Sequence, residues 1–264
     1  FYTVHTPIQA CGRHLKKLQE KAAYLPTSVQ LNSQEHEGET SHLQDRADYA
    51  TMVYAMDENV GRLLPKHDQH GLSKNTVVIF TSDNGGLSTL RPRRDAPTSV
   101  KPLRAGKGWC YEGGIRVPAI IRAPGITAAN SVNSTPIISM DFFPTMLSLA
   151  GLQPRPDLHP DGIDLLPLLQ GKPIHRETLY WHYPHYHGST WTPGAALRSG
   201  GWKLIEFYDY NKVELYHLKE DIGEEKDLSD AFPLLRKKLI DELHRWQKEV
   251  NAKMPTVNRD YNSG

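Results

Sequence analysis

A short polar segment follows one of the most apolar runs of the chain. Residues 76–81 read Thr-Val-Val-Ile-Phe-Thr, and residues 82–86 read Ser-Asp-Asn-Gly-Gly. The β-branched and aromatic run predicts a strand buried on both faces, as in a parallel sheet. Side chains that follow such a strand lie at its carboxyl end, where open α/β sheets place their ligands. The Asp83 carboxylate and the Asn84 amide oxygen are hard ligands suited to Ca²⁺ or Mg²⁺, although the same residues also favour an ordinary turn.

A glycine-rich segment further along the chain carries a lysine. Four glycines fall between residues 106 and 114, which predicts a loop whose backbone passes close to another group. Lys107 stands between two of these glycines and could project its ammonium toward an anion. The ordinary alternative is a solvated surface lysine. Glu112 and Arg116 are four residues apart and could brace the loop as an ion pair.

Aromatic and imidazole side chains gather in a third segment. Residues 181–188 read Trp-His-Tyr-Pro-His-Tyr-His-Gly, and Trp191 follows. This density suits a sugar-binding platform, in which rings stack on the sugar and polar tips bind its hydroxyls. The candidate substrate-binding residues are His182, Tyr183, His185 and His187. The alternative is a linker whose aromatic rings pack on the main domain, whereas a metal site is disfavoured because no acid or cysteine lies nearby.

Taken together, the segments Thr81–Gly86 and Gly106–Pro118 resemble the type I sulfatases. These arylsulfatase-like enzymes are formylglycine-dependent members of the alkaline phosphatase superfamily. His5-Thr6-Pro7, after an apolar start, is similar to the histidine segment of that family, and residues 197–204 resemble a hairpin of its C-terminal sheet. The resemblance covers nearly the whole chain and corresponds to the C-terminal half of such an enzyme.

The resemblance implies a role for each matching residue. Asp83 and Asn84 become ligands of Ca²⁺, with Mg²⁺ as the alternative ion. His5 becomes a group beside the leaving-group oxygen, where it protonates that oxygen or orients the ester. Lys107 becomes the cation that holds the sulfate oxygens. The implied activity is hydrolysis of a sulfate ester carried by a glycan or another small molecule, and the aromatic segment favours a sulfated carbohydrate.

The chain departs from the family pattern at the nucleophile. In the family, a formylglycine is made from the cysteine of a Cys-x-Pro-x-Arg motif, and neither Cys11 nor Cys110 lies in such a motif. The family's other metal carboxylates precede the segment that His5 resembles. We therefore expect an N-terminal half to supply the formylglycine, and we expect this fragment alone to be inactive. The start at Phe1, without an initiator Met or a signal-peptide pattern, is typical of a truncated chain.

Two other functions fit the same residues. The first is a phosphate or phosphonate ester hydrolase of the same superfamily, which would share the metal ligands and Lys107. The second is a non-catalytic module, either a degenerate sulfatase or a glycan-binding remnant. Pairing between the two cysteines cannot be judged from their positions.

Composition excludes two classes of partner. The 264 residues carry a formal net charge of +1, which gives no bulk attraction to nucleic acid or to a membrane surface. An uninterrupted apolar run long enough to cross a membrane is absent from the sequence. Family resemblance implies a periplasmic or secreted setting, and the sequence does not indicate an oligomeric state.

The elements that must position these residues follow an α/β pattern up to residue 172. We expect a short strand at residues 1–4, an irregular and helix-poor surface segment at 11–42, and a second buried strand at 117–122. A helix from residue 43 onward is predicted by apolar residues every four positions, namely Met52, Met56, Val60 and Leu64. Another helix begins near Ser139 or Asp141 and stops at Gly151. Residues 1–172 thus form the C-terminal part of a mixed β-sheet sandwiched by helices.

Residues 173–264 follow a different pattern, typical of a small α+β subdomain. Short strands are predicted at 179–183, 195–198, 202–208 and 213–218, with a tight hairpin at Gly200-Gly201. A final helix places five apolar residues on one face, namely Leu235, Leu239, Leu243, Trp246 and Val250. The acid-rich segment 220–230 is expected to be a solvated loop, and histidines in polar stretches, His14 and His36 among them, are expected to be solvated.

Overall fold

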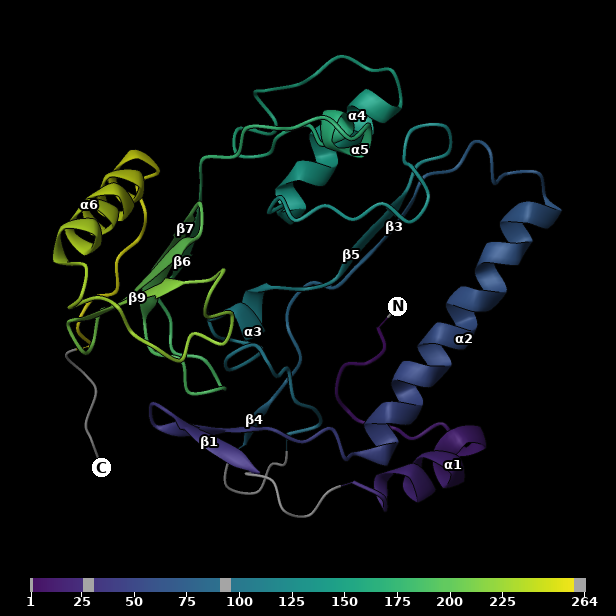
Figure 1. Ribbon diagram of the computed structural model, residues 1–264, viewed down its shortest axis with the longest axis horizontal. Coiled ribbons are helices and arrows are strands. Elements are labelled where there is room, and N and C mark those ends of the chain that lie inside the picture. The colour runs from purple at the N-terminus through teal and green to yellow at the C-terminus, as the bar shows by residue number, and fades with distance from the viewer. Residues whose placement is uncertain (1, 26–30, 91–95, 259–264) are drawn as a thin grey trace. The chain divides into compact units, whose positions relative to one another are not determined.

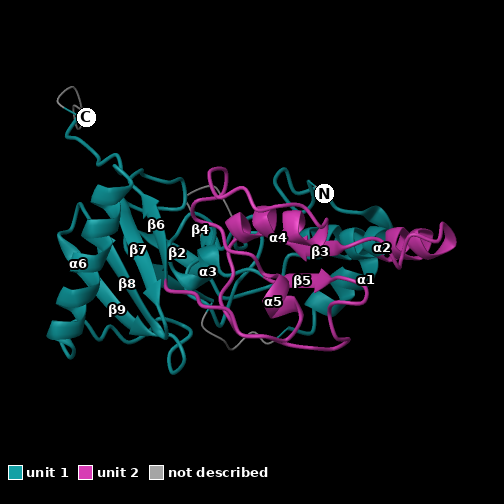
Figure 2. Cartoon of the chain, turned by 90° about the horizontal axis from the view of Figure 1, so that it is seen from above, with its two compact units in different colours: residues 1–60, 82–117, 178–264 teal, residues 61–81, 118–177 magenta. Residues whose placement is uncertain are grey.

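A computed structural model describes residues 2–25, 31–90 and 96–258 (Figure 1). The chain forms two compact units, and each unit is assembled from separate stretches of sequence (Figure 2). Unit 1 comprises residues 1–60, 82–117 and 178–264, and unit 2 comprises residues 61–81 and 118–177. The predicted division of the domains at residue 172 stays a prediction. Helices combined with β-sheets confirm the mixed α/β class.

The C-terminal part of unit 1 is a four-stranded antiparallel sheet. Its strands are β6 (Thr178–Tyr183), β7 (Gly194–Ser199), β8 (Trp202–Phe207) and β9 (Lys212–His217), in the order β6-β7-β8-β9. Ser199 pairs with Trp202 across the two-residue turn at Gly200-Gly201, so the predicted hairpin is confirmed. All four predicted strands are present, with bounds shifted by at most a few residues, because alternating apolar side chains and tight turns are strong local signals.

Both faces of this sheet are covered by apolar packing. Helix α6 (Pro233–Glu249) places Leu239 and Leu243 against the face that carries Leu197 and Leu204. The opposite face carries Ala196, Ile205, Phe207 and Tyr216, which pack against Trp109, Tyr111 and Trp191. Trp109 and Tyr111 belong to the glycine-rich segment. The segment that carries Lys107 therefore packs against this face of the C-terminal sheet.

The N-terminal part of unit 1 corrects two predictions. Residues 11–42 contain helix α1 (Gly12–Ala22) and a hairpin of β1 (Asn32–Glu35) and β2 (Gly38–Ser41), so the helix-poor prediction is wrong. Leu15, Leu18 and Ala22 are half-buried at helical spacing within the polar sequence. In the part of residues 1–4 that the structure describes, a turn replaces the predicted strand, since the His5 N–H donates to the Tyr2 carbonyl at 3.1 Å.

Polar contacts hold α1 against the first half of helix α2 (Ala47–Gln69). The Cys11 backbone N–H donates to Thr51 Oγ1 at 2.8 Å, and His14 Nε2 lies 2.9 Å from a Glu58 oxygen. The predicted helix from residue 43 onward is confirmed, with Met52 buried as its pattern required. Strand β4 (Thr89–Leu90) completes a three-stranded antiparallel sheet in the order β1-β2-β4.

Unit 2 contains a two-stranded sheet and short helices. Strands β3 (Val78–Thr81) and β5 (Ala119–Arg122) pair antiparallel, with Val78 opposite Arg122. Both predicted strands exist, but the predicted parallel pairing and burial on both faces are wrong for the residues described here. Every residue of β3 is half-buried or exposed, and Ile120 of β5 is 63% exposed. The β-branched residues favour an extended backbone, whereas the burial of the strand depends on the elements that pack against it.

The helices of unit 2 are organised around one buried carboxylate. Asp141 ends the 3₁₀ turn η1 (Ser139–Asp141) and precedes α4 (Phe142–Leu149), as predicted for a helix that starts here. Its oxygens accept the backbone N–H groups of Ile138 and Ile163 at 2.8 and 3.0 Å, and Arg176 completes the ion pair. The short helix α5 (Leu166–Leu169) follows.

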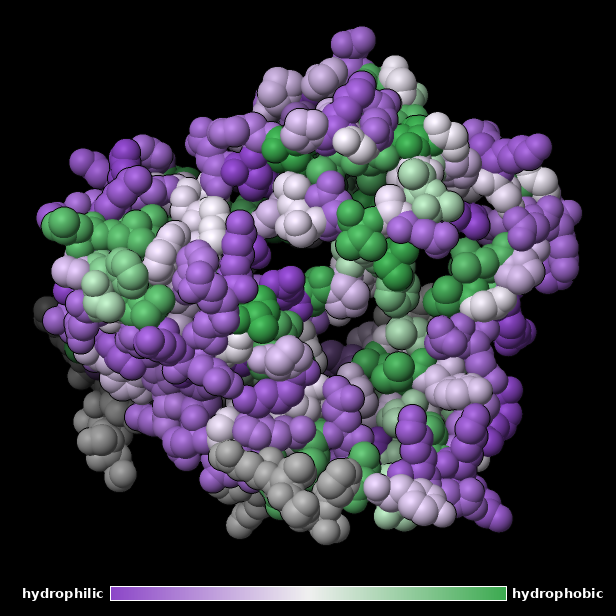
Figure 3. Space-filling view, in the orientation of Figure 1, coloured by the Kyte–Doolittle hydropathy of each residue, from purple (hydrophilic) through white to green (hydrophobic). Residues whose placement is uncertain are grey.

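Apolar side chains also lie on the surface of the molecule between hydrophilic ones, as the green patches of Figure 3 show.

Candidate functional site

The Asp83-Asn84 pair lies in the open turn that directly follows β3, as the sequence predicted. Asp83 is exposed and Asn84 is half-buried. The turn is closed locally by the Ser82 hydroxyl, which donates to the Asn84 backbone carbonyl at 2.9 Å. Neither the Asp83 carboxylate nor the Asn84 side-chain amide has a hydrogen-bond partner among the residues that the structure describes. Two oxygen donors are therefore available to a ligand at this turn.

Backbone hydrogen bonds join this turn to the Lys107 loop, which we define as residues 104–114. The Gly85 N–H donates to the Gly114 carbonyl at 2.9 Å, and the Lys107 N–H donates to the Gly86 carbonyl at 2.9 Å. The two segments singled out from the sequence are thus one backbone framework in unit 1. These backbone hydrogen bonds fix the position of Lys107 relative to Asp83 and Asn84.

The glycines are required by this close approach. A Cβ atom added at Gly85 would lie 1.7 Å from the Gly113 carbonyl oxygen, and one added at Gly114 would lie 2.0 Å from the Trp109 carbonyl oxygen. Real Cβ atoms essentially never come closer than 3.0 Å to another heavy atom. The prediction that the glycine-rich loop passes close to another group is confirmed, and the group is the Asp-Asn turn together with the loop's own backbone.

Lys107 is half-buried at the centre of the loop. Its ammonium makes no ion pair or hydrogen bond within residues 2–25, 31–90 and 96–258. The position of Lys107 is therefore set by its backbone and not by contacts of its charged end. An unneutralised cation beside an oxygen-donor turn can bind an oxyanion.

The C-terminal aromatic segment reaches the residue next to Lys107. The His187 ring lies directly against Gly108, because a Cβ atom added at Gly108 would stand 2.0 Å from His187 Nδ1. Gly108 also has a φ of +91°, which disfavours any side chain there. His187 Nδ1 accepts the Ser189 backbone N–H at 3.0 Å, so the neutral ring carries its proton on Nε2. One predicted substrate-binding residue thus adjoins the Lys107 loop.

The other predicted substrate-binding residues divide into two groups. Tyr183 stacks on Trp191 with an interplanar angle of 12°, and the His185 ring lies 6.1 Å from the Tyr183 ring. His182 instead uses both ring nitrogens within the protein, donating from Nε2 to the Lys253 carbonyl and contacting the Tyr208 hydroxyl through Nδ1. Tyr183 and His185 remain half-buried and exposed, respectively, and keep polar atoms available for a ligand.

His5 lies in the N-terminal turn and is exposed. Its Nδ1–H donates to the Thr6 carbonyl at 2.8 Å, and the Tyr2 hydroxyl lies 3.4 Å from the same nitrogen. Within the described residues no contact joins His5 to Asp83, Asn84 or Lys107. The Nδ1 bond leaves Nε2 as the nitrogen that can exchange a proton with a ligand.

The side chains of the predicted metal site can be compared with the ligands that Ca²⁺ or Mg²⁺ requires. In the described part of the chain, no group of three or more His, Cys, Asp or Glu side chains is gathered at one point. Asp83 and Asn84 fit Ca²⁺ or Mg²⁺ in chemical type, since both ions take oxygen ligands, but they fill only part of a shell of six or more. Cys110 is no candidate ligand, because burial raises the pKa of its thiol to about 12 and keeps it protonated. Both cysteines are free, which answers the pairing question.

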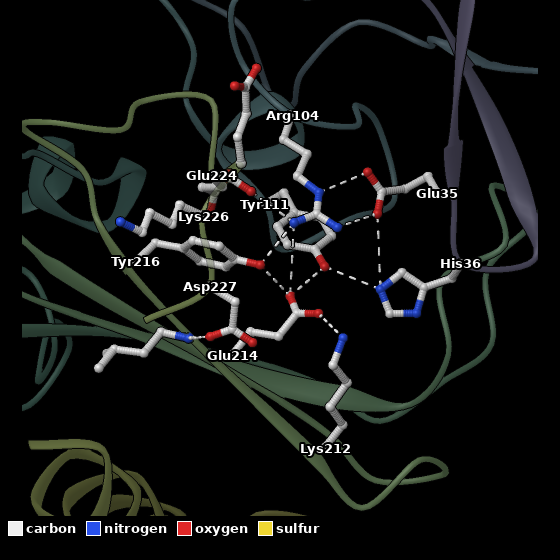
Figure 4. A network of polar contacts seen from close by, with 12 residues as sticks. Glu35, His36, Arg104, Tyr111, Lys212, Glu214, Tyr216, Glu224, Lys226 and Asp227 are labelled. Atoms are coloured by element: carbon white, nitrogen blue, oxygen red, sulfur yellow. Dashed lines mark hydrogen bonds and ion pairs between the residues drawn. The ribbon is translucent and has the colours of Figure 1, made fainter. Parts of the chain in front are cut away.

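A buried polar network anchors the start of the Lys107 loop (Figure 4). The Arg104 guanidinium donates to both oxygens of Glu35 at 2.7 and 2.8 Å and to the Tyr216 hydroxyl at 2.8 Å. It also lies 4.0 Å above the Tyr111 ring, which adds a cation–π contact. These partners come from β1, β9 and the loop itself. No sequence motif marks them, because each is an ordinary charged or aromatic residue until the fold brings them together.

The same network corrects the prediction for His36. Only 10% of its side chain is exposed, and its ring packs 4.6 Å from Phe207 and 5.4 Å from Trp109. Its Nε2–H donates to the Tyr111 hydroxyl at 3.1 Å, while that hydroxyl donates to Glu214 at 2.5 Å. Burial lowers the pKa of His36, although the Glu214 and Glu35 carboxylates act in the opposite direction. His36 is therefore a neutral core residue and not a solvated one.

Comparison with known proteins adds family information. A family model described as Sulfatase matches residues 1–152, and one described as N-sulphoglucosamine sulphohydrolase, C-terminal, matches residues 105–252. A protein named Sulfatase from Formosa agariphila is 35% identical over 231 aligned residues, which cover 78% of this chain and 40% of the relative. The N-acetylgalactosamine-6-sulfatase of Rattus norvegicus is 43% identical over 146 residues, covering 55% of this chain and 26% of that enzyme.

A solved structure shares the fold as well. The structure of BT4656 in complex with its substrate D-glucosamine-2-N,6-O-disulfate has a TM-score of 0.66 and 30% sequence identity. The match covers 79% of this chain and 41% of that one. The chain therefore spans less than half the length of each of these three proteins.

Proposed function

This chain belongs to the sulfatase family, and from that premise we propose that it is part of an enzyme that hydrolyses sulfate esters of carbohydrates. The observation that carries the proposal is the backbone framework that joins the Asp83-Asn84 turn to the Lys107 loop. It joins an oxygen-donor turn to a cation that has no partner among the described residues. A fixed cation and a metal ion both stabilise the negative charge that develops when a sulfate ester is cleaved.

Lys107 is proposed to bind the sulfate group. Cleavage of the sulfur–oxygen bond leaves negative charge on the departing oxygen, and a fixed ammonium stabilises that charge. Because no protein group neutralises Lys107 among the described residues, its full charge is available to the substrate. Its half-buried position reduces the screening by water that weakens exposed charges.

Asp83 and Asn84 are proposed as two ligands of a Ca²⁺ ion, with Mg²⁺ as the alternative. When bound, such an ion supplies positive charge that stabilises an oxyanion. The chain's own contribution is to hold a carboxylate and an amide oxygen in an open turn whose backbone is fixed by the Gly85 and Lys107 hydrogen bonds. Further ligands are needed to complete the shell, and we propose that they come from the part of the family domain that lies outside this chain.

His5 is proposed to protonate the departing oxygen or to orient the ester. The hydrogen bond from Nδ1 to the Thr6 carbonyl orients the ring and leaves Nε2 to contact the ester. Proton donation from Nε2 requires the cationic ring, because the neutral ring keeps its proton on Nδ1. We further propose that the nucleophile is a formylglycine in the same outside part, since neither cysteine of this chain lies in the required motif.

A sulfated carbohydrate is the proposed substrate class. Relatives named for sulfated amino sugars support this choice, as does the imidazole and aromatic cluster of Tyr183, His185 and His187 beside Gly108. The His187 ring, which lies against Gly108, is proposed to contact the sugar near the sulfate. His182 is proposed to shape this wall indirectly, because both of its nitrogens are already engaged.

A periplasmic or secreted location is the corresponding proposal for the enzyme, because family resemblance implies that setting. Among the described residues, no helix has both the length and the apolar character needed to cross a membrane.

Kinetics of a Lys107→Ala variant of the complete enzyme test the proposed role directly. We expect kcat for a sulfate ester to fall by a factor on the order of 10², because one transition-state contact is removed. Lys101→Ala is the matched control, since Lys101 is an exposed lysine near the loop. Turnover close to wild type in Lys107→Ala would remove Lys107 from the mechanism.

A further inference from the structure

Glu224 contacts both ends of the Lys107 loop in unit 1. It comes from the acid-rich segment 220–230, for which the sequence predicted solvent exposure. The prediction fails at this position, because Glu224 is fully buried with a relative exposure of 0%. Its φ of +51° places it in a left-handed turn that points back at the loop.

The carboxylate of Glu224 binds the C-terminal end of the loop. One oxygen accepts the Glu112 backbone N–H at 2.6 Å, and the other lies 2.8 Å from the Lys203 ammonium. Lys203 also pairs with the Glu112 carboxylate at 3.1 Å, and its side chain is 0% exposed. A lysine of β8 is thus enclosed by two carboxylates, one on the loop and one on the turn.

The backbone of Glu224 binds the N-terminal end. Its carbonyl accepts an N–H of the Arg104 guanidinium at 2.8 Å, the same guanidinium that clamps Glu35 (Figure 4). The turn that presents Glu224 is fixed in place, because Asp221 accepts the backbone N–H groups of Glu225 and Lys226 at 3.0 and 2.9 Å.

We propose that Glu224 is a positioning residue that fixes Lys107 for catalysis, a role that rests on the proposed function of Lys107. The physical reason is the absence of any contact that fixes the Lys107 ammonium itself within the described residues. Its position depends on the backbone between Arg104 and Glu112. Glu224 holds Glu112 through its carboxylate and Arg104 through its backbone carbonyl. A change of the carboxylate therefore loosens the Glu112 end of the loop and shifts the cation without contacting it.

A double-mutant cycle in the complete enzyme separates this role from simple stabilisation of the fold. Glu224→Gln keeps an acceptor for the Glu112 N–H but removes the charge that faces Lys203. We expect kcat for a sulfate ester to fall about 10-fold or more, because small displacements of a catalytic group cost up to about 10²-fold. In a Lys107→Ala background the same change is expected to cost less than about 2-fold.

Glu225→Gln is the matched control, since Glu225 is the exposed neighbour and its carboxylate contacts neither end of the loop. Glu224→Asp keeps the charge and is expected to recover part of the lost kcat. It also replaces Glu224→Gln in the cycle if that variant does not fold. Equal losses of kcat in the wild-type and Lys107→Ala backgrounds would overturn the proposal.

Amide hydrogen exchange provides a readout that does not need activity. The Lys107 and Gly113 N–H groups are bonded to the Gly86 and Arg104 carbonyls, and we expect their exchange to quicken at least about 10-fold in Glu224→Gln but not in Glu225→Gln. Unchanged exchange would overturn the anchoring, whatever the enzyme does. Faster exchange in an enzyme that cleaves no sulfate ester would contradict the proposed function and leave the anchoring intact.

Discussion

Replacement of Gly85 by alanine is the most specific perturbation of the framework that joins the Asp83-Asn84 turn to the Lys107 loop. The added Cβ would meet the Gly113 carbonyl oxygen at 1.7 Å, half the distance at which ordinary contacts begin, 3.4 Å. Gly113 cannot retreat freely, because its N–H donates to the Arg104 carbonyl at 2.9 Å and a Cβ added at Gly113 would stand 2.2 Å from the same oxygen. The turn and the loop must therefore separate by more than an ångström.

Three effects determine how much Gly85→Ala changes the free energy of unfolding. Forced separation in a packed region costs about 1–3 kcal/mol, and loss of the hydrogen bond from Gly85 to Gly114 costs about 1 kcal/mol more. Alanine also reduces the entropy of the unfolded chain, which returns about 0.4–1 kcal/mol. We expect a net loss of about 1–3.6 kcal/mol, which lowers the Tm of a protein of this size by roughly 2–14 °C.

The assay is thermal unfolding of this chain, with calcium binding measured alongside in the complete enzyme. Gly61→Ala is the matched control, because Gly61 lies inside α2 with nothing within 4 Å of an added Cβ. Alanine there should raise stability by about 0.5–1 kcal/mol through helix propensity. If Gly85→Ala were as stable as Gly61→Ala and bound calcium normally, the close contact between the two segments would be wrong.

Three further predictions concern single side chains. Burial holds the pKa of His36 below its ordinary value of 6.5. The stability that the neutral ring contributes is therefore present above about pH 6.5 and is lost as the pH falls toward the pKa of the folded state. The Tm should fall between about pH 7.5 and 5.5 in the wild type, and it should fall less in His36→Asn. Asp83→Ala should remove the rise in Tm that calcium produces in the complete enzyme, and an undiminished rise would exclude Asp83 as a ligand. His187→Phe keeps a ring against Gly108 but lacks both ring nitrogens, so KM for a sulfated sugar should rise about 10-fold. An aryl sulfate without sugar hydroxyls should be cleaved as before, and equal effects on both substrates would contradict a sugar contact.

Local patterns predicted the elements that depend on neighbouring residues. The Gly200-Gly201 hairpin and the apolar face of α6 were predictable because turn chemistry and helical spacing are properties of short segments. The turn after β3 was predictable for the same reason. Helix α1 was missed because its apolar face is narrow, with Leu15 and Leu18 set among charged residues.

Burial of charged residues could not be predicted from local patterns. Glu224 and His36 lie in polar segments, and only their distant partners, Lys203 for one and Tyr111 for the other, make burial favourable. The surroundings of β3 were mispredicted for a related reason, since a β-branched run does not encode strand direction or what covers its faces. Asp83, Asn84 and Lys107 were found by motif, whereas the hydrogen bonds that unite them came only from the structure.

We propose that the Lys107 loop and the Asp83-Asn84 turn form part of a sulfate ester hydrolase. The most direct test of this proposal compares kcat/KM of the complete enzyme for a sulfated amino sugar and for the matching phosphate monoester, in the presence of calcium. We expect kcat/KM for the sulfate ester to exceed that for the phosphate ester by at least about 10²-fold. A preference for the phosphate or a phosphonate ester, or no hydrolysis of any sulfate ester, would contradict it.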